Sequence, residues 1–317
     1  MKSTSPLKKI VIFGGGTGLS CVLSGMKQFP MDVTAVIAVS DDGSSTGVLR
    51  EELDIPAVGD LGKVLLAMAN VDDDFVRLLR YRFEKDGTLH NHPVRNVLLA
   101  ALIDLKGSLT EASRYMCKLL NVQGTVLPLT EEKVDLIGYG ENAWYIGESA
   151  VSQNVENIKR LTYDHPIKVS QEILDKIAEA DLIIFSPGSL YTSIMPHLII
   201  PSISEAIEKA KAPVMYLCNL VSQPGETDGY SVSDHLKVLN NRLGSRKVDV
   251  VIANTGEVDL AVSDTYKNEN KTIVPLDREV VEELGAEIIA EDIIRIDNGS
   301  IRHNELKTAY LVFSYFM

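Results

Sequence analysis

The chain has few cysteines, the residues that hold zinc-binding and disulfide-bonded proteins together. Its 317 residues include three cysteines, Cys21, Cys117 and Cys218, which lie far apart inside apolar runs. No two of them are spaced as CxxC, so we expect neither a zinc site nor a disulfide framework, and buried free thiols are the simpler interpretation. Aromatic residues make up only 6% of the chain, which leaves little for a flat ligand to stack on.

Positive charge is also scarce, because 31 Lys and Arg residues face 44 Asp and Glu residues, for a net charge of −13. General binders of nucleic acid or of anionic membranes need clustered positive charge, so both classes are disfavoured, whereas a local basic pocket for one phosphate ester is not. The chain has no apolar run of the ~18 residues that span a bilayer, and its start lacks the apolar core of a signal peptide. We therefore expect a cytoplasmic protein without a membrane span.

Two catalytic signatures are missing as well. Without a GxSxG elbow or a Walker A sequence, nucleophilic hydrolysis and ATPase chemistry have no support. What the chain does have is a buried strand at Lys8–Phe13, a glycine-rich loop, a helical stretch to about Phe29 and a second apolar run at Val33–Val39. This order of strand, loop, helix and strand is typical of the opening of a parallel α/β sheet.

The same alternation returns later in the chain. Between the two parts, from Gly124 to Glu148, short β-rich runs at 125–129 and 134–139 predict a small antiparallel element. We predict a single α/β domain over residues 1–317, with a Rossmann-like, mostly parallel sheet flanked by helices and this element inserted at about 124–148. The spacing of apolar residues predicts further helices at 64–83, 94–105, 171–180, 202–211 and 232–243, and strands at 181–185, 214–218 and 248–253.

The loop at 14–18 (GGGTG) is the first candidate for ligand binding. Glycines between a strand and a helix let the backbone approach a ligand closely, and the free amides of the first helical turn attract an anion. The third glycine of the dinucleotide fingerprint is replaced by Leu19, so nicotinamide binding does not follow. A tight structural turn is the alternative, but the strand and helix on either side favour contact with a phosphate.

Asp41 and Asp42 follow the second predicted strand, at the same edge of the sheet. An acid at this position often binds a ribose hydroxyl, and either carboxylate is a candidate ligand for a divalent metal such as Mg²⁺. The alternative is a plain turn in which one of the two caps the helix that starts near Ser45.

Two later polar loops also follow predicted strands. The first, at 186–193 (SPGSLYTS), repeats a glycine turn followed by hydroxyl groups that can donate to phosphate oxygens, although the same hydroxyls serve as ordinary helix caps. The second, at 219–230 (NLVSQPGETDGY), carries amide and carboxylate groups suited to a base or a sugar hydroxyl. Ligands of open parallel sheets bind beyond the carboxyl ends of the strands, so we expect the three loops to build one pocket.

His90 and His92 precede a predicted helix, but no third histidine or nearby cysteine completes a metal set. His92 is a candidate acid, base or phosphate contact, and a helix start is the equally supported alternative. The predicted contacts to a nucleotide or phosphate are Gly14, Gly15, Gly16, Thr17, Gly18, Asp41, Asp42, Asn91, His92, Asn96, Gly188, Ser189, Tyr191, Thr192, Ser193, Asn219, Gln223, Thr227 and Asp228.

Several segments, taken together, are similar to the motifs of one protein family. They are GGGTGL at 14–19, PAVGD at 56–60, LHNH at 89–92 with NVLLA at 96–100, PGSLYTS at 187–193, and GETDGY at 225–230 with SDH at 233–235. The chain resembles the YvcK/CofD family from about Lys8 to Asn304, and most closely the branch called the gluconeogenesis factor. After Gly59-Asp60 that branch commonly has an Arg-Asn pair, whereas this chain has Lys63 as the candidate for the positive charge.

The resemblance implies a Rossmann-like bacterial protein that binds a nucleotide sugar of the UDP-N-acetylglucosamine type and supports cell shape and wall synthesis on gluconeogenic carbon sources. The other branch implies the alternative, a 2-phospho-L-lactate transferase of deazaflavin coenzyme biosynthesis that uses a guanine nucleotide donor and magnesium. We assign no certain cofactor and no catalytic residue, and whether the protein is an enzyme or a homo-oligomer stays open.

Overall fold

The computed structural model describes residues 6–317, with the backbone alone at 260, 261, 263 and 264. A seven-stranded sheet crosses the molecule in the order β10-β9-β8-β7-β1-β2-β3, and every neighbouring pair in it is parallel. The seven strands are β1 (Lys8–Gly14), β2 (Met31–Ile37), β3 (Thr125–Pro128), β7 (Leu182–Phe185), β8 (Val214–Leu217), β9 (Val250–Asn254) and β10 (Glu287–Glu291).

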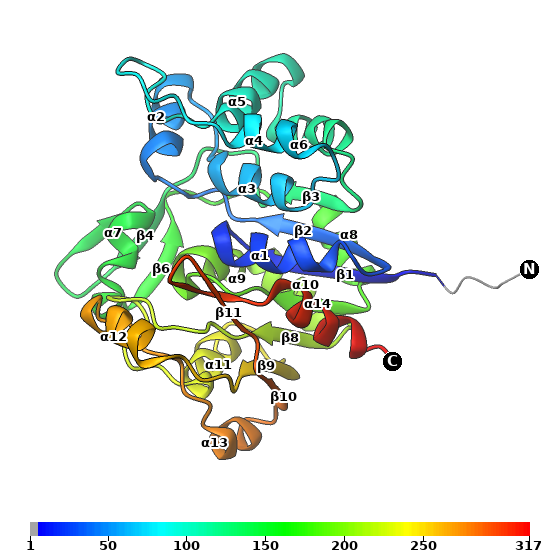
Figure 1. Ribbon diagram of the computed structural model, residues 1–317, viewed down its shortest axis with the longest axis vertical. Helices are drawn as coiled ribbons and strands as arrows, with labels where there is room; N and C mark the ends of the chain where they lie inside the picture. Colours follow the sequence, from blue (N-terminus) through cyan, green and yellow to red (C-terminus); the bar gives the residue numbers. More distant parts are fainter. Residues whose placement is uncertain (1–5) are drawn as a thin grey trace, which may run out of the picture.

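Helices cover both faces of the sheet and extend beyond its two edges (Figure 1). This arrangement confirms the predicted α/β fold. The helices are α1 (Gly16–Met26), α2 (Ser44–Leu53), α3 (Gly59–Ala67), α4 (Asp73–Arg80), α5 (Val94–Lys106), α6 (Leu109–Leu119), α7 (Glu148–Ser152), η1 (Val155–Asn157), α8 (Gln171–Glu179), η2 (Leu190–Ile194), α9 (Met195–Leu198), α10 (Pro201–Lys209), α11 (Val232–Asn240), α12 (Leu260–Asn268), α13 (Arg278–Glu283) and α14 (Glu305–Ser314).

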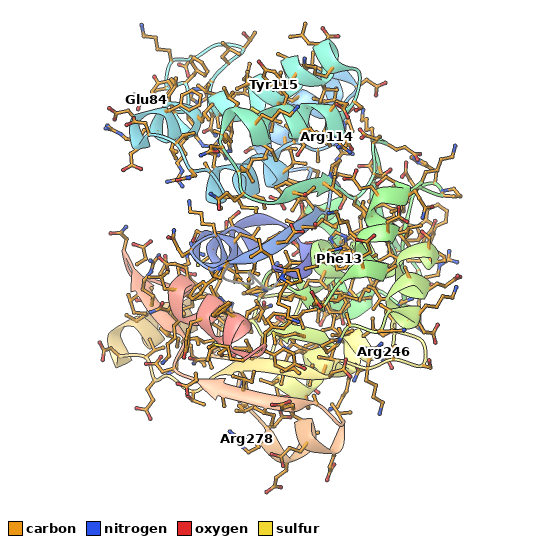
Figure 2. All side chains as sticks on the ribbon, turned by 90° about the vertical axis from the view of Figure 1, so that its right-hand side faces the viewer. Phe13, Glu84, Arg114, Tyr115, Arg246 and Arg278 are labelled. Atoms are coloured by element: carbon orange, nitrogen blue, oxygen red, sulfur yellow. The ribbon has the colours of Figure 1, made fainter. Side chains whose placement is uncertain are left out.

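The core forms because the central strands are apolar on both faces, as strands covered by helices must be. Phe13 of β1 and Phe185 of β7 are fully buried, and their ring centroids lie 6.0 Å apart. In the side view of Figure 2, Phe13 lies near the middle of the molecule, with Arg114 and Tyr115 of α6 toward one end and Arg278 of α13 toward the other. The site described below is built where this rigid core ends.

The chain order reverses between β1 and β7. From β1 the chain proceeds to β2 and β3 on one side, and then returns to place β7, β8, β9 and β10 on the other side. The loops that leave the carboxyl ends of β1 and β7 therefore diverge in opposite directions, and such a switch point is where open α/β sheets bind ligands.

The antiparallel element is confirmed, but its bounds differ from the prediction of 124–148. Residues 125–128 form β3, which pairs in parallel with β2, because their apolar side chains fill the edge of the main sheet rather than a hairpin. The separate antiparallel sheet consists of β4 (Leu136–Tyr139), β5 (Trp144–Ile146) and β6 (Arg160–Tyr163), with β4 in the middle.

The prediction of one continuous helix at 64–83 is also wrong. The segment is divided into α3 and α4, because the side chain of Asp72 accepts a hydrogen bond from the Asp74 amide at 2.9 Å and caps a new helix there. A hairpin of β11 (Ile294–Asp297) and β12 (Ser300–His303) lies toward the C-terminal end of the chain, and β12 contacts α1. Among residues 6–317, no helix has both the length and the apolar character needed to cross a membrane.

Candidate functional site

The glycine-rich first loop turns sharply from β1 into α1. Gly15 occupies the position before the helix, and no side chain caps the helix start. The first-turn amides of an α-helix have no acceptor within the helix. The Gly16 amide donates to the Asp60 carboxylate, so the amides that follow Gly16 are the candidates for an anion. A Cβ atom on Gly18 would lie 2.3 Å from the carbonyl oxygen of Pro187, so only glycine lets the first loop contact the loop after β7.

The second loop, after β7, is held by a carboxylate from the third. Ser189 caps the π-helical turn η2 through a 2.9 Å bond from the Thr192 amide. The buried carboxylate of Glu226 accepts bonds from the Ser189 hydroxyl at 2.7 Å and from the Tyr191 amide at 2.8 Å. Burial raises the pKa of Glu226, and the bonds from the second loop offset part of that rise. Glu226 therefore fixes the second loop to the third.

Side chains of the third loop, after β8, mostly shape the loops themselves. Asn219 donates to the Gly188 carbonyl and accepts from the Gly188 amide, both at 2.8 Å. Thr227 is buried and accepts from the Gln223 amide at 2.9 Å, while Asp228 accepts from the Gly225 amide at 2.6 Å. These bonds set the positions of Gly188 and Gln223.

The three loops surround one cavity of about 370 Å³, which we call the loop cavity. Its wall also includes residues from β12 and from the segment before α13, which the sequence did not predict: Lys271, Ile301, Arg302 and His303. Arg302 is exposed, and among residues 6–317 its side chain makes no hydrogen bond or ion pair. The predicted residues that line the cavity are Gly15, Gly16, Thr17, Gly18, Gly188, Ser189, Ser193, Asn219 and Gln223.

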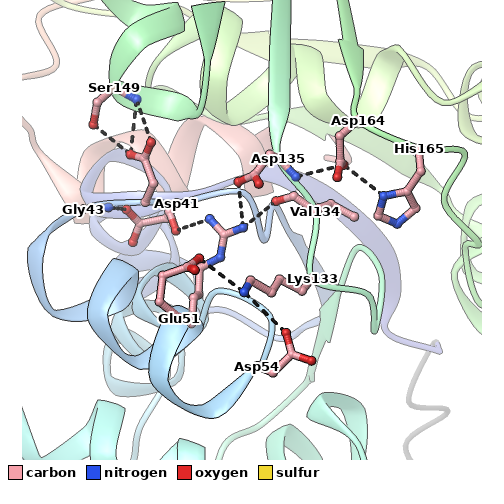
Figure 3. Close-up of polar contacts among 12 residues, drawn as sticks. Asp41, Gly43, Glu51, Asp54, Lys133, Val134, Asp135, Ser149, Asp164 and His165 are labelled. Atoms are coloured by element: carbon pink, nitrogen blue, oxygen red, sulfur yellow. Dashed lines mark hydrogen bonds and ion pairs between the residues drawn. The ribbon is translucent and has the colours of Figure 1, made fainter.

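Four carboxylates lie on one side of the first loop, and we call them the acidic cluster: Asp41, Asp42, Asp60 and Glu148. Asp41 accepts from the Gly43 amide at 2.9 Å (Figure 3). Asp41 also accepts from the Thr46 hydroxyl at 3.0 Å, and Asp42 accepts from the Ser149 hydroxyl at 2.7 Å. The buried Arg50 donates to the Asp41 carbonyl at 3.3 Å and pairs with Asp135 at 2.9 Å. The loop after β2 is thereby fixed to the segment before β4.

Asp60 links this cluster to the glycine loop. A Cβ atom on Gly15 would lie 2.6 Å from its carboxylate, which pairs on the other side with Lys63 at 2.8 Å. Burial raises the pKa of Asp60 despite Lys63, and the charge of Asp41 adds to the rise. The absence of a side chain at Gly15 is therefore what lets a buried acid stand against the loop.

Glu148 is the most perturbed member of the acidic cluster. Burial raises its pKa to about 8, and the charges of Asp41 and Asp60 add to this effect, while the Thr192 hydroxyl donates to it at 2.9 Å. Within the described residues, no three His, Cys, Asp or Glu side chains are arranged to hold a metal ion. Mg²⁺ is usually held by one or two carboxylates together with phosphate oxygens and water, so Mg²⁺ at Asp41 or Asp42 stays a prediction, and we derive no metal step.

The remaining predicted residues do not line the loop cavity. His92 is buried, and its Nδ1 lies 2.9 Å from the Ser45 hydroxyl, which also accepts from Asn96 at 3.2 Å. Asn91 is exposed in the left-handed region and accepts a bond from Arg82 at its carbonyl. His92 and Asn96 therefore connect the start of α5 to Ser45 of α2. The others outside the wall are Gly14, Asp41, Asp42, Tyr191, Thr192, Thr227 and Asp228, of which Tyr191 bonds the Tyr230 hydroxyl at 3.0 Å.

Sequence reasoning missed several groups that the structure brings to the site. Asp60 follows Gly59 in one of the family-like segments, so its place after a glycine was an available signal. Glu148 and Arg302 carry no local signal, because each reaches the site only through folding of a distant segment. His197, behind the first loop, is fully buried with Nε2 3.4 Å from the Gly14 carbonyl, and burial lowers its pKa to about 4.

Comparison with known proteins gives one consistent result. The profile of the family described as 2-phospho-L-lactate transferase CofD matches residues 10–294. The chain is 41% identical over 306 residues to the gluconeogenesis factor of Bacillus subtilis (strain 168), covering 96% of each chain. It is 36% identical over 311 residues to the gluconeogenesis factor of Listeria monocytogenes, covering 97% of this chain and 95% of the other. The crystal structure of protein BH3568 from Bacillus halodurans superposes with a TM-score of 0.92 at 37% identity, covering 97% of this chain and 99% of that one.

Proposed function

Because the chain belongs to the CofD family, and within it is similar over its whole length to gluconeogenesis factors, we propose that it binds a nucleotide sugar of the UDP-N-acetylglucosamine type in the loop cavity. The observation that carries this proposal is the convergence of three strand-end loops at the reversal between β1 and β7. A volume of about 370 Å³ lies within the range of small-molecule sites.

The cavity has the donors that a diphosphate requires. Thr17 and Gly18 of the first helical turn line it together with the hydroxyl-bearing Ser193, and Arg302 adds a permanent positive charge to the wall. The Gln223 amide group is available for a sugar or a base, although it also donates to Ser152 at 2.9 Å. Binding would then rest on neutral backbone donors and one guanidinium.

Binding without chemistry is the version we favour. The imidazole in the cavity wall belongs to His303, whose Nε2 donates to the Cys218 carbonyl at 3.0 Å. Burial lowers the pKa of His303 to about 4, so the ring stays neutral and committed near pH 7. We therefore propose a cytoplasmic protein that senses a wall precursor and is required for cell shape on gluconeogenic carbon sources, a role suggested by its similarity to gluconeogenesis factors.

The second candidate is the phospholactyl transfer that the family profile describes. The acidic cluster favours this reaction, because a divalent cation would reduce the repulsion among its four carboxylates beside the glycine-rich loop. Thermal denaturation with UDP-N-acetylglucosamine, GDP and NAD, each with and without Mg²⁺, separates the two functions. Stabilisation by the uridine sugar alone supports sensing, and stabilisation by GDP only with Mg²⁺ supports the transferase.

A matched pair of glycine variants tests the location. Gly16 (φ +66°) and Gly107 (φ +82°) both have left-handed backbones, and an added Cβ meets no atom closer than 3.5 Å at Gly16 and none within 4 Å at Gly107. Gly16→Ala and Gly107→Ala should therefore each lower stability by about 1 kcal/mol. Only Gly16→Ala should weaken UDP-N-acetylglucosamine binding, by about tenfold, in a calorimetric titration. Equal affinities for the two variants would place the ligand elsewhere.

A further inference from the structure

A second cavity, of about 760 Å³, lies next to the loop cavity, and we call it the basic cavity. It is enclosed by α1, α3, α4, the start of α5 and the hairpin β11–β12, and it shares Thr17, Cys21 and Arg302 with the loop cavity. Nothing in the proposed nucleotide-sugar site uses its far wall.

The wall of this cavity concentrates positive charge in a protein whose net charge is −13. Lys63 is paired with Asp60, and Arg295 is paired with Glu305 and lies 3.7 Å from Asp297. Among residues 6–317, the side chains of Arg80, Arg95 and Arg302 make no hydrogen bond or ion pair. The cationic residues of the wall are Lys27, Lys63, Arg80, Arg95, Arg295 and Arg302, against the acids Asp73, Asp297 and Glu305.

Arg95 is the most unusual of these cations, because its residue is only 7% exposed and its Nε has no partner within the described residues. Its aliphatic part packs over α3 at Gly62, where a Cβ atom would lie 3.3 Å from the Arg95 Cδ. Guanidinium groups that are buried normally have a carboxylate or several carbonyl partners, since desolvation without them is costly. The fold therefore places the buried guanidinium group of Arg95 at the cavity wall, where no protein acceptor among the described residues pairs with it.

The neighbouring cations make the charge harder to bury. Burial lowers the pKa of Arg95 to about 10, and repulsion by Arg82 and Arg80 adds to the effect. Burial likewise lowers the pKa of Lys27, whose Nζ donates to the Ala69 carbonyl at 2.7 Å, and Arg80 again adds repulsion. A ligand with more than one negative charge would remove both the desolvation cost and the mutual repulsion.

We propose that the basic cavity binds a small, multiply charged anion of the phosphate-ester class, held by the Arg95 guanidinium with Lys63 and Arg80, at a site separate from the nucleotide-sugar pocket. A phosphate group fits this wall better than a single carboxylate. It accepts from a planar fork and from additional cations at the same time, which uses three or more of the groups present.

The test is calorimetric titration of the full chain with inorganic phosphate and with pyrophosphate at low ionic strength, with sodium chloride at matched ionic strength as the blank. Arg95→Met is compared with Arg77→Met, a change of equal charge on α4 at an exposed residue paired with Asp74. We expect Arg95→Met to bind pyrophosphate at least tenfold more weakly than the native protein, and Arg77→Met to stay within twofold. Arg95→Lys keeps the positive charge but loses the planar guanidinium group. Its affinity for pyrophosphate should therefore lie between those of Arg95→Met and Arg77→Met.

Two further readouts separate a binding role from a structural one. Without anion, Arg95→Met should melt at the same temperature as the native protein or higher, because an unpaired buried charge is removed; a clear decrease would indicate a structural role and overturn the proposal. Pyrophosphate affinity should be unchanged when UDP-N-acetylglucosamine is saturating, and its loss would place both anions in one site.

Equal pyrophosphate affinity in Arg95→Met and Arg77→Met, or no heat beyond the chloride blank, would also overturn the proposal. The phosphate titrations decide this site even if UDP-N-acetylglucosamine does not bind, so the two proposals can fail separately.

Discussion

The two sides of the first glycine loop carry opposite charge. On one side lies the acidic cluster, where burial and mutual repulsion raise the pKa of Glu148 to about 8. On the other lies the basic cavity, where burial and repulsion lower the pKa of Arg95 to about 10. The ion pair of Asp60 and Lys63, at 2.8 Å, joins the two sides beneath the loop.

This difference shows that neither side is electrostatically satisfied by the protein alone. Carboxylates with raised pKa values gain from a proton or a cation, and cations with lowered pKa values gain from an anion. Perturbed groups of this kind cluster at functional sites, and here they flank the glycine-rich first loop. The Asp60–Lys63 ion pair therefore lies between a region of excess negative charge, the acidic cluster, and a region of excess positive charge, the basic cavity.

The largest expected effect comes from breaking that ion pair. Lys63→Met leaves the buried Asp60 carboxylate facing Asp41 without a counter-ion, which should lower the free energy of unfolding by about 2 to 3 kcal/mol at pH 8. The pKa of Asp60 is already raised in the folded state, so the penalty applies above that pKa and disappears as the pH falls toward 4. Urea denaturation across this pH range measures it.

The control for this variant is Lys209→Met, which removes a lysine from an exposed pair with Glu205. Exposed pairs contribute little, so its effect should stay below about 1 kcal/mol at every pH. A loss in Lys63→Met that does not change with pH would mean that packing of the lysine stem, and not the charge of Asp60, is what matters.

A smaller effect, a gain in stability, is expected in the acidic cluster. The folded pKa of Glu148 lies above its unfolded value, so the folded state binds the extra proton and native stability falls as the pH rises from about 4.5 to about 8. Glu148→Gln removes this loss and keeps an acceptor for Thr192. Discounted for partial exposure, the gain should be on the order of 1 to 2 kcal/mol at pH 8 and close to zero at pH 5.

The exposed Glu52, on α2, provides the comparison, since Glu52→Gln should change stability by less than about 0.5 kcal/mol throughout. If Glu148→Gln were destabilising at pH 8, Glu148 would be charged and held by an attraction absent from the contacts described above.

The smallest effect concerns a region outside both sides. Ser45→Ala removes the hydroxyl that His92 and Asn96 share, which should cost about 1 kcal/mol of stability. UDP-N-acetylglucosamine and pyrophosphate affinities should both stay unchanged, because none of the three residues lines either cavity. A weaker nucleotide-sugar affinity would instead support His92 and Asn96 as the ligand contacts that the sequence predicted.

Local patterns predicted the parts of the fold that depend on neighbouring residues. The strand at Lys8–Gly14, its glycine loop and the later strands at 182–185 and 214–217 all follow from apolar runs that end in glycine or polar residues. The prediction of residues 125–128 as part of a small antiparallel element is wrong, because strand length and composition do not say which partner a strand selects. The break between α3 and α4 depends on one cap at Asp72, which apolar spacing does not report.

Local sequence patterns are enough to place glycine loops at the carboxyl ends of parallel strands, because strand, loop and helix signals follow one another in the chain. Which charges meet beside those loops depends instead on the folded structure. Glu148 and Arg95 come from segments far apart in the chain, and their burial and pKa values depend on neighbours that folding alone brings within reach.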